Sequence, residues 1–281
     1  MVQSTNVQSR TVHYDTVQKG TVQDQNCEMA SQQPIQNQPN QGVEWMSAPQ
    51  AVTGAPPGLE YLGALDQIIV KQRVELLEML SGYETQNKYD VKNSMGQQCY
   101  FAQEESDCCS RQVCGPNRPY VIHITDNNGQ EVMSVRHEFV CCTGCCWCAT
   151  NSSCGYEVAI EAPVGNIIGY AKQHTSAWKP HIRVLDANRQ EMFVLRGPCC
   201  WGCQNVYCTD DIEFSVTDQA EDKYLGRMFK RWAGCGRETF TDADTFGVTF
   251  PLDMPVPAKA LLFGAVFLVD FMYFERAKHS Y

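Results

Sequence analysis

The chain has 281 residues, 19% of them charged, and a formal net charge of −10 at pH 7. This length suffices to bury a full hydrophobic core, so about one large domain plus a tail is expected. The acidity argues against electrostatic attachment to nucleic acid, which is therefore an unlikely partner, or to an anionic membrane surface.

Residues 1–57 are rich in Gln, Asn, Ser and Thr and contain few large apolar side chains. Such a segment cannot bury enough surface to offset the entropy lost on ordering, so we predict a disordered tail over 1–57. Its prolines favour extended conformations that can present short ligands to partner proteins.

Ordered structure is expected to begin near Gly58. Leucine and isoleucine recur at three- and four-residue steps over 59–80, which suits a helix, whereas Ile68, Ile69 and Val70 suit a short strand equally well. Both interpretations remain open for this segment.

From Tyr89 onward, short runs of alternating apolar and polar residues are separated by turns that contain Gly, Asn and Asp. This pattern predicts β-hairpins. About ten to twelve such strands in succession form an antiparallel meander, which must close or stack to hide its edges.

The last apolar run, 258–274, has apolar residues on every face and must be surrounded by lipid or by protein. It has about 17 residues and would reach roughly 25 Å as a helix, whereas a span needs roughly 30 Å. Lys259 and Asp270 interrupt it, so we favour a helix over 260–274 enclosed by a closed barrel, with a membrane span as the alternative. The residues expected to pack there or to need a buried partner are Ala260, Gly264, Phe267, Asp270 and Phe274.

The 16 cysteines concentrate in three segments between predicted strands, around 108–114, 141–154 and 199–208. Because the N-terminus has no apolar signal core, we expect these thiols to stay reduced. Two predicted strands separate the first and second groups and four separate the second and third, so all three groups should lie at one end of the barrel. Zinc binding, S-acylation near a membrane, and buried thiols without chemistry are three interpretations of them.

Several motifs resemble the phospholipid scramblase family closely. They are GLEYLGALDQIIVKQRVELLEMLSGYET, the NKYDVKNSMGQ hairpin, CCTGCCWC, RGPCCWGC, TFTDADTFGVTFPLD and the terminal ALLFGAVFLVDFMYFE. The resemblance runs from about Pro56 to Glu275. It implies a mainly β, tubby-like domain over 58–275, an antiparallel barrel of about twelve strands around a C-terminal hydrophobic helix, followed by a short polar tail over 276–281.

The resemblance also implies palmitoylation of the cysteine cluster, which would attach palmitoyl groups to Cys141, Cys142, Cys145, Cys146 and Cys148. The cluster departs from the family pattern because Thr143 and Gly144 interrupt it, and the N-terminal tail lacks a clear PxxP or PPxY motif. The implied location is the cytoplasmic face of the plasma membrane, through a single span or lipid anchors. Other membranes and the nucleus are further locations that the resemblance implies.

The segment 242–253 matches the family's calcium-binding loop, which resembles an EF-hand. The ligands that this implies for Ca²⁺ are Asp242, Asp244, Phe246, Val248 and Asp253. Phe246 and Val248 offer only backbone carbonyls, and Asp253 is shorter than the usual bidentate Glu, so binding should be weak, roughly 10⁻⁴–10⁻³ M. The alternation of Phe246, Val248 and Phe250 supports a different interpretation, a barrel strand entered through an Asp-rich turn.

Two functions follow from these features. The resemblance implies Ca²⁺-dependent, ATP-independent, bidirectional movement of membrane phospholipids between leaflets. The alternative is a palmitoylated, calcium-responsive, membrane-associated adaptor without transport, which an enclosed terminal helix would favour. No catalytic triad, phosphate-binding loop or pair of catalytic acids is visible in the sequence, so we do not expect an enzyme.

Overall fold

Twelve strands, one long helix and several short helical segments lie in the part of the chain that the computed structural model describes. That part comprises residues 44–47, 49, 54–73, 85–140, 149–151, 154–176, 179–198, 211–231 and 245–275, with side chains as far as Tyr273. All of it belongs to one compact unit, residues 38–281.

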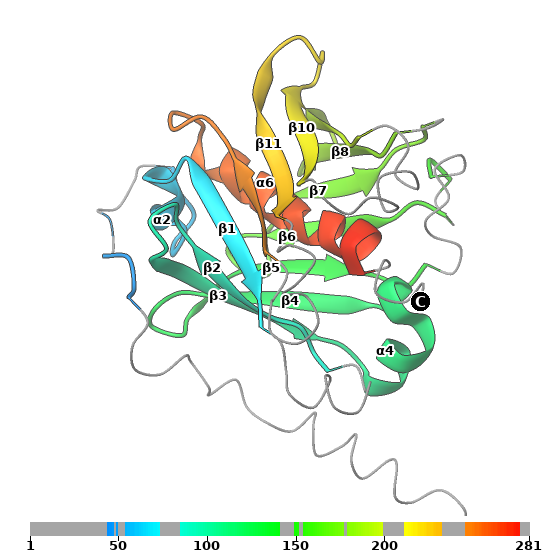
Figure 1. Ribbon diagram of the computed structural model, residues 1–281, viewed down its shortest axis with the longest axis horizontal. Helices are drawn as coiled ribbons and strands as arrows, with labels where there is room; N and C mark the ends of the chain where they lie inside the picture. Colours follow the sequence, from blue (N-terminus) through cyan, green and yellow to red (C-terminus); the bar gives the residue numbers. More distant parts are fainter. Residues whose placement is uncertain are drawn as a thin grey trace, which may run out of the picture. The chain divides into compact units, whose positions relative to one another are not determined.

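The strands form a closed antiparallel barrel in which each pairs with the next and β12 pairs with β1 (Figure 1). This closure confirms the mainly β barrel expected from the sequence. The strands are β1 (Gln67–Gln72), β2 (Lys88–Lys92), β3 (Gln98–Glu105), β4 (Tyr120–Thr125), β5 (Glu131–His137), β6 (Glu157–Glu161), β7 (Ile167–Gln173), β8 (His181–Asp186), β9 (Glu191–Arg196), β10 (Ile212–Asp218), β11 (Tyr224–Arg231) and β12 (Thr245–Thr249).

Tight turns join alternate pairs of strands, and their side chains explain why the chain reverses there. In the β4–β5 turn, one carboxylate oxygen of Asp126 accepts hydrogen bonds from the amides of Asn128 and Gln130 at 2.8 and 2.9 Å. Gly129 closes that turn with a φ of 76°, a left-handed conformation that glycine adopts without strain. We call this end of the barrel the hairpin rim.

The longer connections emerge at the opposite end, which we call the cysteine rim. One of them, between β3 and β4, contains the helix α4 (Cys108–Cys114) and the 3₁₀ turn η1 (Gly115–Asn117). The side chain of Asp107 caps α4 by accepting a 2.8 Å hydrogen bond from the amide of Ser110.

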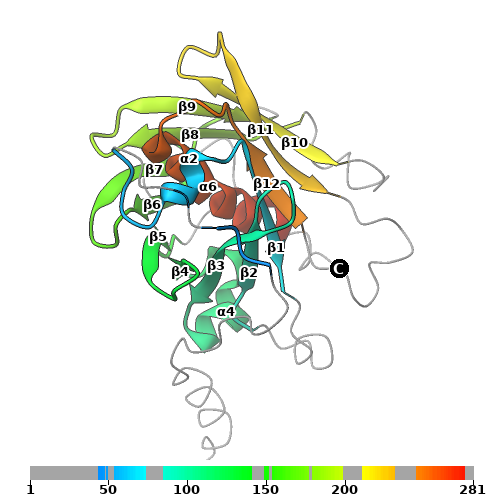
Figure 2. The ribbon, with the colours of Figure 1, turned by 90° about the vertical axis from the view of Figure 1, so that its left-hand side faces the viewer.

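The helix α6 (Val256–Val269) fills the barrel and continues as the π-helical turn η2 (Asp270–Glu275). It begins four residues before the predicted start at Ala260, because Pro257 is tolerated in the first turn, where an amide needs no internal partner. Figures 1 and 2 show it running through the ring of strands. Every residue from Ala258 to Tyr273 is buried, which confirms the expected enclosure. The Phe274 side chain lies outside the described residues.

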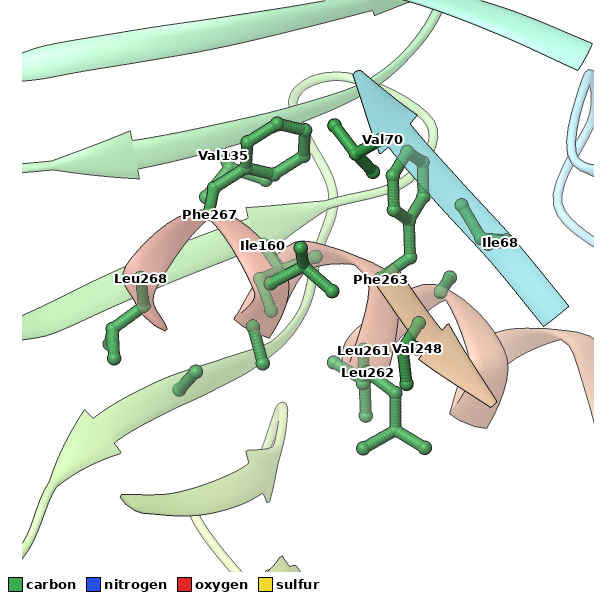
Figure 3. Close-up of a cluster of buried hydrophobic side chains, with 14 of the residues drawn as sticks. Ile68, Val70, Val135, Ile160, Val248, Leu261, Leu262, Phe263, Phe267 and Leu268 are labelled. Atoms are coloured by element: carbon green, nitrogen blue, oxygen red, sulfur yellow. The ribbon is translucent and has the colours of Figure 1, made fainter. Parts of the chain in front are cut away.

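The core is formed where inward side chains of the strands meet the helix. Figure 3 shows Val70, Val135 and Ile160 from the barrel gathered around Phe263 and Phe267 of α6. A methyl group added to Gly264 would lie 2.7 Å from Ile160 Cδ1, so this glycine allows the helix to approach β6 closely. The side chain that Gly264 approaches is therefore aliphatic.

Both interpretations of residues 59–80 are partly correct. A single helical turn, α2 (Glu60–Gly63), precedes β1, and the β-branched run Ile68, Ile69 and Val70 lies in that strand. Residues 74–80 lie outside the described part.

The described chain already contacts the barrel before residue 58, inside the predicted tail. The Met46 amide donates to the Gln98 carbonyl at 2.9 Å, and the Gln98 amide donates to the Glu44 carbonyl at 2.8 Å. Met46 also covers Cys99, with 3.7 Å between the two sulfur atoms. Residues 1–43 lie outside the described part.

Candidate functional site

Strand topology brings the cysteine-bearing segments to one end of the barrel. The strands β4 and β5 separate the first group from the second, and β6 to β9 separate the second from the third. Since an even number of antiparallel strands returns the chain to the same end, the three connections start and finish at the cysteine rim. The strand counts predicted from the sequence are therefore confirmed.

The described cysteines of this rim differ in exposure. Cys109 is exposed and free, while Cys114 and Cys154 are free and half-buried. Cys108 is disulfide-bonded, so the expectation of reduced thiols does not hold at that position. The five cysteines predicted to carry palmitoyl groups lie outside the described residues, and their acylation stays a prediction. The chain enters their segment after Phe139, whose side chain is 52% exposed.

A buried ion pair holds the β3–β4 connection against the barrel. Nε and Nη2 of Arg118 donate to the two carboxylate oxygens of Glu104 at 2.6 and 2.9 Å, and both side chains are almost completely buried. Burial raises the pKa of Glu104, but the Arg118 guanidinium outweighs burial and the net pKa is lowered. Because either charge alone would be buried and uncompensated, loss of one partner should be strongly destabilising.

Stacked rings join the same connection to the end of the helix. Arg118 lies over the ring of Phe271 in η2, with its guanidinium carbon 4.8 Å from the ring centroid. Phe271 in turn stacks on Tyr120 at 3.9 Å. The hydroxyl of Tyr156 donates to the carbonyl of Pro116 at 2.8 Å, which ties the second cysteine-bearing connection to the first.

His137 lies in the centre of this aromatic layer, stacked on Tyr156 with 3.9 Å between the ring centroids. Its Nδ1 is 2.8 Å from the Glu157 carbonyl, and its buried Nε2 has no hydrogen-bond partner among the described residues. Burial lowers the pKa of His137 from 6.5 to about 4, and the Arg118 charge adds to that effect. The imidazole is therefore neutral at physiological pH.

The predicted calcium ligands that the structure describes are spread along a strand. Phe246 and Val248 lie in β12 with side chains buried in the core, and the strand is paired with β1 and β11. Asp253 is exposed in the turn that follows, at the hairpin rim, whereas β12 begins at the cysteine rim. Asp242 and Asp244 lie outside the described residues. Residues 245–249 thus adopt the barrel-strand alternative rather than a wrapped loop, and the calcium site stays a prediction.

The two polar residues of the terminal helix both have buried partners. The ammonium of Lys259 donates to the carbonyls of Leu62, Leu65 and Leu252 at 3.0, 2.6 and 2.9 Å. Near the other end, the hydroxyl of Tyr89 donates to the carboxylate of Asp270 at 3.0 Å, which confirms the expected buried donor. By length and composition alone, Val256–Tyr273 could cross a membrane, and 94% of that stretch is buried inside the protein.

Among the residues that the structure describes, no three His, Cys, Asp or Glu side chains gather closely enough to hold a metal ion. The cysteine pairs considered for zinc, Cys142 with Cys145 and Cys200 with Cys203, lie outside those residues, so that alternative stays open.

Comparison with known proteins identifies the family. The family model described as Scramblase matches residues 46–276. The chain belongs to the scramblase family. It is 46% identical over 234 residues to phospholipid scramblase 1 of Homo sapiens, which covers 83% of this chain and 71% of that protein. It is 43% identical over 253 residues to phospholipid scramblase 2 of Bos taurus, which covers 87% of this chain and 83% of that protein. No solved structure matches.

The region matched by the family model begins at Met46, where the chain of this scramblase-family protein already contacts the barrel. Sequence reasoning missed both the Glu104–Arg118 pair and the partners of Lys259. A polar residue inside an otherwise apolar run was the available signal for Lys259, because a buried charge requires partners. No comparable signal marks Glu104 or Arg118, since charged residues near turns are usually solvated.

Proposed function

We propose that this protein moves phospholipids between the two leaflets of a membrane, in both directions and without ATP. Family membership over residues 46–276 is the observation that carries the proposal, together with similarity to relatives named phospholipid scramblase. The protein is then a membrane-associated lipid translocator rather than an enzyme.

The proposal includes Ca²⁺ as the activating ion, bound by the Asp-rich segment 242–253. Asp242 and Asp244 would supply the leading carboxylate oxygens, and backbone carbonyls would complete the site. Asp253 follows five strand residues and would contribute least, because two ligands of one calcium ion must lie within about 5 Å of each other given Ca–O distances of about 2.3–2.6 Å.

Membrane attachment is proposed to occur through palmitoyl groups on the cysteine cluster 141–148, at the cytoplasmic face of the plasma membrane. One acyl chain binds a membrane only marginally, and stable anchoring needs at least two signals. Several neighbouring cysteines can provide them, which a chain of net charge −10 cannot obtain from electrostatic attraction to anionic lipids.

The test is a leaflet-labelled liposome assay with the purified full-length protein. Fluorescent phosphatidylcholine and phosphatidylserine in the inner leaflet should become accessible to a membrane-impermeant quencher when Ca²⁺ is added, without nucleotide. EDTA should return the rate to that of protein-free liposomes. Lipid transfer that stays at the protein-free rate with Ca²⁺ would contradict intrinsic scrambling.

A second candidate function is a palmitoylated, calcium-responsive adaptor without transport. The burial of α6 favours it, because a helix used as the core of the barrel is not available as a membrane span. This candidate predicts Ca²⁺-dependent changes in the barrel and in membrane binding, with no lipid transfer in the liposome assay.

A further inference from the structure

The barrel closes at a seam between its first and last strands. β1 and β12 pair antiparallel from Gln67 with Thr249 to Lys71 with Thr245. At the hairpin rim, the amide of Phe250 donates to the carbonyl of Asp66 at 2.9 Å, so the segment entering β1 meets the segment leaving β12. The integrity of the barrel depends on this pairing, because every other neighbouring pair of strands is consecutive in sequence.

Lys259 of α6 bridges that seam. Its ammonium donates to the carbonyls of Leu62 and Leu65 before β1, and to the carbonyl of Leu252 after β12. An ammonium has three donors and no acceptor, so these three carbonyls use its full capacity. The side chain is completely buried, and Phe250 places its ring centroid 5.1 Å from the nitrogen. We call the three carbonyls the ammonium cage.

Two carboxylates support the charge from outside the cage. Burial lowers the pKa of Lys259, while the charges of Asp66 and Asp253 act in the opposite direction. Both aspartates are exposed, one on each side of the seam. Asp253, which the sequence predicted as a calcium ligand, therefore lies close enough to the ammonium cage to stabilise the charge of Lys259.

The cage is one of two contacts that distinguish the barrel from lipid as a surrounding for the helix; the other is the hydrogen bond from Tyr89 to Asp270 near the opposite end. Most of the helix surface is apolar and can be buried equally well in either surrounding. A lysine near the end of a membrane helix can extend its ammonium to the interface, so Lys259 is compatible with a bilayer. Inside the barrel, in contrast, the same ammonium is stable only because the three carbonyls receive it.

We propose that Lys259 is a latch that holds α6 in the barrel across the β1–β12 seam, and that opening the ammonium cage lets the helix enter a lipid bilayer. This latch rests on the proposed function, because opening it is the step that would bring a lipid translocator into the membrane. α2 lies beside the first turns of α6 and carries Leu62, whose carbonyl is one of the three that form the cage (Figure 2).

The main test compares Lys259→Met with Lys71→Met in the full-length protein, in EDTA. Both changes remove one lysine charge near the seam, but Lys71 is exposed on β1 and belongs to no cage. Hydrogen exchange is followed by mass spectrometry with and without vesicles of phosphatidylcholine and phosphatidylserine. The Lys259→Met protein should bind the vesicles in a form that resists carbonate extraction. In the vesicle-bound protein, the amides of 256–273 should stay protected, whereas those of β1 and β12 should exchange about tenfold or more faster than in wild type. Lys71→Met should behave as wild type.

A second variant keeps the proposal testable if Lys259→Met does not fold. The double change Asp66→Asn with Asp253→Asn alters two exposed side chains and leaves the core intact. The double variant should increase the vesicle-bound fraction relative to wild type, by a smaller amount than Lys259→Met does. Equal vesicle binding and equal exchange in wild type and the double variant would overturn the latch. So would a folded Lys259→Met protein that remains soluble with β1 and β12 protected. These readouts report the position of the helix, so failure to transfer lipid would refute the proposed function and leave the latch result standing.

Discussion

Replacing Phe267 by aspartate is expected to unfold the barrel, because this ring lies at the centre of the helix that fills it. The side chain is completely buried, with its ring centroid 5.4 Å from Tyr89 and 5.6 Å from Phe263. Removing a buried phenylalanine ring costs about 3–5 kcal/mol. The new carboxyl must be buried in its neutral form, which at pH 7 costs about 4 kcal/mol, since an ordinary aspartate pKa is about 3.9.

The sum of these two effects, about 7–9 kcal/mol, is comparable with the whole stability of a typical domain, about 5–15 kcal/mol. Thermal and urea unfolding followed by circular dichroism should therefore show no cooperative transition for Phe267→Asp. Phe267→Leu, which keeps most of the apolar volume, should cost about 1–2 kcal/mol. Val113→Asp, at a position that is 84% exposed, should change stability by about 0.5 kcal/mol or less.

Two results would show that α6 is not the core of the barrel. A Phe267→Asp protein that melts with wild-type cooperativity would show that α6 does not serve as the core. A chain ending at Asp253 that still unfolds cooperatively would lead to the same conclusion. If the helix instead only spans a membrane, the substitution should detach the protein from membranes and leave the barrel folded.

Three further predictions concern calcium, acylation and pH. In a calcium titration of lipid transfer, Asp242→Ala should reduce the Ca²⁺ response more than Asp253→Ala, because β12 separates Asp253 from the Asp-rich turn. Equal losses would instead support a wrapped loop. Changing the five cysteines of 141–148 to serine should move the protein from the membrane to the soluble fraction of cells, and unchanged plasma-membrane residence would refute acyl anchoring. The contribution of His137 to stability should be constant above about pH 6.5 and fall by about 3 kcal/mol towards pH 4, because the pKa of buried His137 is lowered from 6.5 to about 4 and only the unfolded chain takes up the proton in that range. His181, whose pKa is also lowered to about 4, should add a loss of the same sign. His137→Phe should reduce this loss in urea titrations across pH, and an unaltered pH dependence would exclude His137 as its source.

Periodicity and apolar composition were sufficient to predict the architecture. Alternating runs separated by Gly, Asn and Asp turns identified the strands, and the even numbers between cysteine groups placed those groups at one rim. A helix that is apolar on all faces requires an apolar surrounding, and a barrel requires a filling, so the enclosure of α6 also followed. These properties depend on local pattern, which each segment of the chain carries by itself.

The partners of individual polar groups were decided only by the tertiary structure. Lys259 reaches carbonyls 194 and 197 residues earlier in the chain, because closing the barrel brings the segment before β1 beside the start of α6. Glu104 meets Arg118 because β3 pairs antiparallel with β4, which brings the end of β3 beside the segment that enters β4. Asp253 lies away from the start of β12 because residues 245–249 are extended. Such contacts depend on strand register and on closure between distant segments, and a buried charge signals only that it needs a partner, without identifying which one.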